Sequence, residues 1–98
     1  MIEQEKKDIE EVLGDKISDP RYRVIFYHKY GFTEEALKDE YWHIRLEAYR
    51  HLGFTKEALD DDDPIIRHEA YLNLGYTEEA KLDKDPLIRV EASLWFSI

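Results

Sequence analysis

One phrase recurs every 22 residues through most of this chain. Residues 30–37 read YGFTEEAL, residues 52–59 read LGFTKEAL and residues 74–81 read LGYTEEAK. No insertion separates these copies, and a partial fourth copy follows them as far as Ile98. A fixed period in this range is typical of a solenoid, because each unit buries its apolar face only against its neighbours. The repeat therefore constrains the architecture strongly, whereas it specifies no reaction and no ligand.

The third copy, residues 63–84, begins with a helix-start signal. Asp63 can cap free amide groups, and Pro64 fits the first helical turn. The apolar residues that follow are spaced by four and so lie on one helical face, and a glycine then ends the helix in the left-handed conformation. These residues are Ile66, Ala70 and Leu74, followed by Gly75.

A second, shorter helix follows the glycine. Thr77 stands at its N-cap, and two glutamates occupy its first turn, where the helix dipole favours acids. This helix is barely longer than one turn, a length typical of a 3₁₀-helix. We therefore expect long helices at 20–30, 42–52, 64–74 and 86–96, and short helical turns at 33–38, 55–60 and 77–82.

The pattern predicts an all-α fold, a short right-handed α-solenoid of about three and a half 22-residue repeats, each a long helix and a short helix. Residues 1–18 lie outside the repeat and are expected to form an N-terminal capping helix that covers the first repeat. The whole chain is expected to be one domain. Its solenoid, 19–98, comprises repeats 19–40, 41–62, 63–84 and 85–98.

Arginine is the most regular charged residue, because it recurs at one position of every copy, and an aspartate precedes it by six residues in the last three. Two interpretations are open: Asp–Arg pairs that hold successive repeats together, or an arginine stripe that binds a ligand. We expect the first, a structural ladder in which the arginines contact the preceding aspartates or the adjacent carboxylates of the link between repeats. The arginines are Arg23, Arg45, Arg67 and Arg89, and the aspartates are Asp39, Asp61 and Asp83.

These columns, meaning residues at equivalent positions of successive copies, also resemble those of a known repeat. Residues 61–70 read DDDPIIRHEA, and residues 83–92 follow the same pattern. This pattern resembles the HEAT-like repeat: an aspartate is followed by Asp-Pro, then by an aliphatic residue and arginine, and then by an alanine. The short period also resembles that of the leucine-rich-repeat variant, which alternates an α-helix with a 3₁₀-helix. The resemblance covers roughly residues 17–98 and implies protein interaction without a particular activity.

The chain departs from both families. HEAT units are longer, about 40 residues, and Ile17 stands where the first ladder aspartate should be. The iron–sulfur module of the variant family needs cysteines, and this chain has none. Neither family therefore implies a cofactor here.

Composition excludes several partners. The net charge of −9 disfavours direct binding to nucleic acid and to anionic membranes, because both are themselves negative. The absence of cysteine excludes disulfides and thiol chemistry. No apolar run has the length of a signal peptide or a bilayer span, so we expect a cytoplasmic protein.

No catalytic, cofactor-binding or metal-binding residue is predicted, and we expect no enzyme. The four histidines fall in four different columns of the repeat and lack a metal-binding spacing such as HExxH, so we expect them to be scattered over the surface. The aspartate run 60–63 lacks the EF-hand loop pattern and is better explained by helix capping.

Tyrosine recurs on the flank of the long helices, at Tyr27, Tyr49 and Tyr71. Packing between repeats is one interpretation of this column. The alternative is a secondary partner-binding stripe, because tyrosine combines apolar area with a polar tip.

The outer face of the last helices is a sharper signal, because residues 86–98 are apolar nearly all round. A helix that is hydrophobic on every side is normally buried on every side. This helix therefore either caps the end of the core and leaves apolar side chains exposed to solvent, or meets a partner. Trp95 stands where earlier copies carry Lys29, His51 and Asn73. We call the predicted partner-binding residues the apolar strip; they are Ile65, Leu72, Leu87, Val90 and Leu94, with Trp95 beside them.

We therefore expect a protein–protein interaction module, a binding scaffold or small regulator, that meets a second copy or a different host protein through its C-terminal helix. The alternative is an acidic inhibitor that imitates nucleic acid and binds a DNA- or RNA-binding protein. The net charge and the column Glu47, Glu69 and Glu91 fit that alternative. Against it, packed helices lie about 8–10 Å apart, a looser spacing than that of phosphates along a strand.

Overall fold

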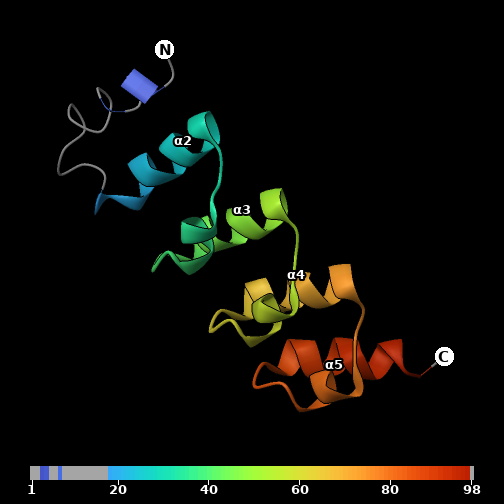
Figure 1. Ribbon diagram of the computed structural model, residues 1–98. Helices are drawn as coiled ribbons and strands as arrows, with labels where there is room; N and C mark the ends of the chain where they lie inside the picture. Colours follow the sequence, from blue (N-terminus) through green and yellow to red (C-terminus); the bar gives the residue numbers. More distant parts are fainter. Residues whose placement is uncertain (1–2, 5–6, 8–17, 98) are drawn as a thin grey trace. The chain divides into compact units, whose positions relative to one another are not determined.

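The computed structural model describes residues 3–4, 7 and 18–97. From residue 18 onward these residues form α-helices that alternate with short 3₁₀-helices, and no strand occurs among them (Figure 1). The expected capping helix over residues 1–18 lies mostly outside the described part of the chain. The α-helices are α2 (Pro20–Tyr30), α3 (Trp42–Leu52), α4 (Pro64–Leu74) and α5 (Pro86–Trp95), and the 3₁₀-helices are η2 (Glu34–Lys38), η3 (Lys56–Asp60) and η4 (Glu78–Leu82).

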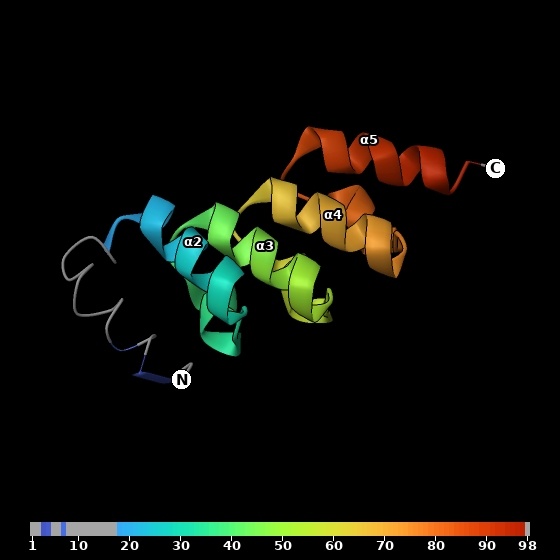
Figure 2. The ribbon, with the colours of Figure 1, turned by 90° about the horizontal axis from the view of Figure 1, so that it is seen from above.

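These bounds agree with the helix positions expected from the sequence to within one residue at each end. The α-helices begin at residues 20, 42, 64 and 86, so each start follows the previous one by 22 residues. The chain divides into two compact units, residues 1–52 and 53–98, and each is described by itself. Within the second unit, α4 and α5 lie next to each other (Figure 2).

Three of the α-helices start as the Asp-Pro signal predicts. An aspartate at the N-cap accepts a hydrogen bond from the amide two residues later, and proline occupies the first turn. The missing amide of proline costs nothing there, because the first turn has no intrahelical acceptor for it. The bonds are Arg21 N–H to Asp19 at 2.9 Å, Ile65 N–H to Asp63 at 2.8 Å and Leu87 N–H to Asp85 at 2.8 Å.

The repeated glycines end these helices in a conformation more restrictive than the expected left-handed one. Gly31, Gly53 and Gly75 all have positive φ, as predicted. At Gly31 and Gly75 ψ is extended, however, with φ/ψ of 103°/144° and 97°/142° respectively. A left-handed residue has ψ near +47°, whereas this region is close to one that only glycine adopts readily.

The short helices are 3₁₀-helices, but threonine does not cap them as expected. Thr33, Thr55 and Thr77 occupy the N-cap positions with extended backbones, yet no threonine side chain makes a capping hydrogen bond there. The threonine carbonyls instead accept from the amides three residues later, as in Ala80 N–H to Thr77 at 3.0 Å. Backbone bonds therefore define these helices.

Small and large apolar residues alternate in the core of each unit. In residues 18–52 the buried cluster comprises Phe32, Ala36, Ile44 and Ala48, with Val24, Tyr27 and Leu37 packed against it. In residues 53–97 it comprises Tyr71, Tyr76, Ala80, Ile88 and Ala92, with Leu59 packed against it.

The core face of α4 is shorter than predicted. Ile66 and Ala70 are fully buried, as expected, and Tyr76 folds back onto the core after the glycine. Leu74, the last residue of α4, is 46% exposed, although its spacing placed it on the same face. The buried face therefore stops before the helix ends.

Candidate functional site

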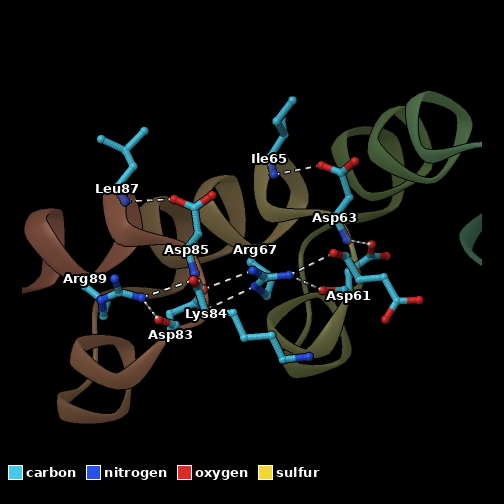
Figure 3. Close-up of polar contacts among 10 residues, drawn as sticks. Asp61, Asp63, Ile65, Arg67, Asp83, Lys84, Asp85, Leu87 and Arg89 are labelled. Atoms are coloured by element: carbon cyan, nitrogen blue, oxygen red, sulfur yellow. Dashed lines mark hydrogen bonds and ion pairs between the residues drawn. The ribbon is translucent and has the colours of Figure 1, made fainter.

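Arg67 links the chain segments on either side of α4 and η4 (Figure 3). Its Nε and one terminal nitrogen donate to the two carboxylate oxygens of Asp83 at 3.1 and 3.0 Å. Its other terminal nitrogen donates to the backbone carbonyls of Asp61 and Asp62 at 2.8 and 3.0 Å. The side chains of Arg67 and Asp83 are only 9% and 7% exposed, so this is a buried, bidentate ion pair.

The other column arginines repeat parts of this arrangement. Arg23 pairs with both oxygens of Asp39 at 3.0 Å and donates to the Ser18 carbonyl. Arg45 donates to the backbone carbonyl of Asp39 at 2.8 Å. Arg89 donates to the carbonyls of Asp83 and Lys84 at 2.7 and 3.1 Å.

The ladder therefore uses atoms other than those expected. Each aspartate six residues before an arginine is contacted through its backbone carbonyl. The carboxylates of Asp39 and Asp83 instead pair with the arginine 16 residues earlier. The lack of an aspartate at position 17 therefore does not prevent the first copy from making this contact. A carbonyl is all that the arginine needs on that side, and Ser18 supplies one to Arg23.

Hydrogen bonding sets the charge state of this pair. Burial by itself would raise the pKa of Asp83, but hydrogen bonds from Arg67 and from the Asp85 amide outweigh it, so that pKa lies below its ordinary value. The hydrogen bond to Asp83 raises the pKa of Arg67. Both groups are therefore charged at neutral pH, and the guanidinium is occupied in structural contacts.

The residues of the apolar strip are all on the surface of the 53–98 unit. Ile65, Leu72, Leu87, Val90 and Leu94 are each between 48% and 60% exposed. Their spacing explains why: residues three and seven apart return to one side of a helix. On α5 only Ile88 and Ala92 are buried, so most of the apolar area of this helix faces outward.

Figure 3 shows how the two helix starts present this strip. The side chains of Ile65 and Leu87 point to the same side, away from the Arg–Asp contacts. Leu72 and Leu94 follow them by seven residues, close to two helical turns, and so continue the same faces. A shallow depression on α5 is lined by Val90, Leu94, Pro86 and Ser93 together with the cations Lys81 and Arg89.

Trp95 partly covers the core and is also partly exposed on the surface. Its ring lies 5.6 Å from that of Tyr76, which is buried, so Trp95 helps to cover the core at this end. It is still 55% exposed, and a large part of the indole is available to a partner.

The tyrosine column is mainly a packing feature. Tyr49 and Tyr71 are buried, and the ring of Tyr71 stacks on Tyr76 at 5.2 Å. Tyr27 is half-buried and stacks on Phe32 at 5.4 Å. Desolvation raises the pKa of Tyr27 and of Tyr71. The expected secondary binding stripe is therefore not available at Tyr49 or Tyr71.

Three of the four histidines are not scattered, which corrects the expectation from their positions in the repeat. His28, His43 and His51 all lie within 4 Å of the carboxylate of Glu47. Sequence reasoning missed this cluster because it searched for histidines in one repeat column. The signal was the spacing of His43, Glu47 and His51, which are four residues apart on one helix face.

None of the helices in the described residues has the length and apolarity that a bilayer span requires. Comparison of the chain with protein-family models, with curated proteins and with solved structures gave no match. The chemistry of the surface must therefore be judged from its own residues. The apolar strip offers aliphatic side chains, which can bury area against a partner but supply no nucleophile, acid or base.

Proposed function

We propose that this chain is a protein-binding module without catalytic activity, and that its contact surface is the apolar strip with Trp95. The observation that carries this proposal is the exposure of five aliphatic side chains on neighbouring helices of one small unit. Exposed apolar patches of this kind usually mark an interface. A HEAT-like α-solenoid, with the repeats stacked in a right-handed array, is the architecture that we propose for the whole chain.

The partner that we propose first is a second copy, joined by a two-fold contact between the α5 helices. In such a contact one patch faces itself, so the residues of the apolar strip that lie on α5 are sufficient to form it. The strip is small beside the roughly 1,200–2,000 Å² that stable interfaces bury. We therefore expect a weak dimer that is populated at high protein concentration.

Light scattering on the full chain tests this proposal. The mass should rise from 11.8 kDa towards twice that value as the concentration increases. Leu87→Glu with Leu94→Glu should abolish the increase and leave the helical content unchanged. Ile25→Glu with Leu52→Glu is the matched control, because these two residues are similarly exposed (63% and 48%, against 57% for Leu87 and 60% for Leu94), lie in the 1–52 unit and receive the same charge.

The salt dependence separates this function from nucleic-acid mimicry. Two copies of charge −9 repel each other, so salt should strengthen an apolar contact between them. A decoy would instead capture basic nucleic-acid-binding proteins and release them as salt rises. The side chain of Glu47 is only 16% exposed and pairs with Arg50, so one acid of the proposed mimic column is already engaged. A monomer at high concentration, together with a captured partner insensitive to the double glutamate variant, would refute the interface.

A further inference from the structure

A group of three potential metal ligands lies in the 1–52 unit, whereas the apolar strip belongs to the 53–98 unit. His28 comes from α2, and Glu47 and His51 come from α3. One ligand atom from each residue lies within 4.8 Å of the others. In the described part of the chain, no other trio of histidine and acidic side chains meets this spacing.

The two oxygens of Glu47 have different neighbours. Oε1 accepts a hydrogen bond from Arg50 at 2.9 Å and lies 3.8 Å from Nε2 of His43. Oε2 lies 3.9 Å from Nε2 of His28 and 3.8 Å from Nε2 of His51. Arg50 therefore fixes the carboxylate through one oxygen, and the other oxygen faces two imidazole nitrogens at distances too long for hydrogen bonds.

These separations are close to those around a bound ion. Zinc lies about 2.0–2.2 Å from histidine nitrogen and carboxylate oxygen, so two ligand atoms in a tetrahedral site are about 3.4 Å apart. The distances from Oε2 of Glu47 to the two histidine nitrogens, 3.9 and 3.8 Å, exceed this by about half an ångström, and the ligand atoms of the two histidines lie within 4.8 Å of each other. The side chains of His28 and His51 are each 50% exposed, and small rotations can close that difference.

A core aromatic ring orients both histidines. The His51 ring stacks on Phe32, with centroids 4.6 Å apart, and the His28 ring meets Phe32 edge-on at 5.1 Å. Phe32 is itself buried in the core of this unit. The two imidazoles are thus held beside Oε2 before any ion arrives, and this preorganisation lowers the entropy cost of binding.

The ligand set selects the class of ion. Two imidazoles and one carboxylate suit zinc and related transition metals, whereas calcium and magnesium prefer sites made only of oxygen. The exposed sides of His28 and His51 leave room for water to complete the coordination. The neighbouring Arg50 cation opposes the ion's charge, which favours moderate over very tight affinity.

We propose that His28, Glu47 and His51 bind one divalent transition-metal ion of the zinc type and thereby tie α2 to α3. This site is independent of the proposed function, because its residues belong to the other unit and its ligand is an ion. An ion that binds only the folded unit stabilises it in proportion to its occupancy.

Calorimetric titration of the full chain with Zn²⁺ should show one ion bound per chain, and Mg²⁺ under the same conditions should show none. Co²⁺ should give the visible absorption of a bound ion with nitrogen ligands. Zn²⁺ should also raise the midpoint of thermal unfolding. Absence of saturable Zn²⁺ binding would overturn the proposal.

The chain supplies a matched pair of variants. His43 and His51 each lie four residues from Glu47 and 3.8 Å from one of its oxygens, but only His51 belongs to the trio. His51→Ala should weaken Zn²⁺ binding by at least the 10–100-fold typical of losing even an outer partner, about the same as Glu47→Gln. His43→Ala should leave it unchanged. Equal losses in the two histidine variants would overturn the assignment.

A measurement on the unaltered chain covers the case in which a variant fails to fold. On addition of Zn²⁺, the ring-nitrogen resonances of His28 and His51 should shift by NMR, while those of His43 and His68 should not. A shift confined to other histidines, or binding that persists after replacement of both His28 and His51, would identify a different site and refute this one.

Discussion

Replacing Arg67 with alanine should destabilise the 53–98 unit far more than the loss of an exposed ion pair would, because the Arg67–Asp83 pair is buried. The substitution leaves the Asp83 carboxylate, 7% exposed, with the Asp85 amide as its remaining partner in the contacts described above. It also removes the donor to the carbonyls of Asp61 and Asp62. Breaking a buried pair by removing one partner costs about 3–5 kcal/mol, and the surviving amide bond places this case near 3 kcal/mol.

A second Arg–Asp pair in the chain provides the control. Arg21 contacts Asp19 through two side-chain nitrogens, but the Arg21 side chain is 83% exposed. The chemistry is the same and the burial differs, so Arg21→Ala should leave the unfolding midpoint unchanged. Urea unfolding followed by far-UV circular dichroism measures both variants. The chain has two tryptophans, Trp42 and Trp95, one in each unit. Variants that retain only one of them report by fluorescence which unit has lost stability.

The decisive comparison is between these two variants. If Arg67→Ala costs no more than Arg21→Ala, burial does not govern the ladder and the reasoning is refuted. Arg67→Met combined with Asp83→Leu should be more stable than Arg67→Ala alone, because no uncompensated charge remains. Partner binding by the apolar strip should survive Arg67→Ala under conditions where the unit is folded.

Further predictions concern the backbone, the caps and pH. Gly75→Ala should cost about 1–3 kcal/mol because of backbone strain, although no atom outside the adjoining residues lies within 4 Å of the added methyl. Gly75→Asn should not recover this loss, because ψ at this position is extended, and thermal unfolding checks both variants. Asp85→Ala should cost about 1 kcal/mol, whereas Thr55→Ala, which removes no capping bond, should be close to neutral in the same assay. The lowered pKa of Asp83 stabilises the fold above its unfolded value of about 3.9, so stability should fall as pH drops below that, and an acid titration of Asp83→Asn should lack this component.

The sequence was sufficient to place the helices because local signals mark both ends of each. In α4, Asp63 and Pro64 set the start and Gly75 sets the end, and these effects need no knowledge of distant contacts. The sequence could not assign the partners of Arg67. With a period of 22, an aspartate six residues before an arginine and one 16 residues after it occupy the same column, so the two pairings are indistinguishable until the chain is folded.

The histidine cluster was missed for the opposite reason. Repeat comparison reveals residues that recur, whereas His28 and His51 depart from their columns, which carry Arg50 and Asn73 in the following copies. Their meeting at Glu47 depends on how α2 packs on α3, and a single-helix pattern records only the His43, Glu47 and His51 spacing. The exposure of the apolar strip, by contrast, follows from helical periodicity alone.

The double contact of Arg67 also has a mechanical consequence. Its bond to Asp83 closes a loop of 16 residues that includes most of α4 and all of η4. A pulling force applied across this segment is carried by the guanidinium before it reaches the helical hydrogen bonds within the loop. Once that bond ruptures, the force passes to these helical hydrogen bonds, and full extension of the 16 residues after Arg67 would add about 55 Å of chain contour. In a single-molecule stretching experiment this side chain should therefore act as a reversible clasp that opens before the helices of the loop unfold.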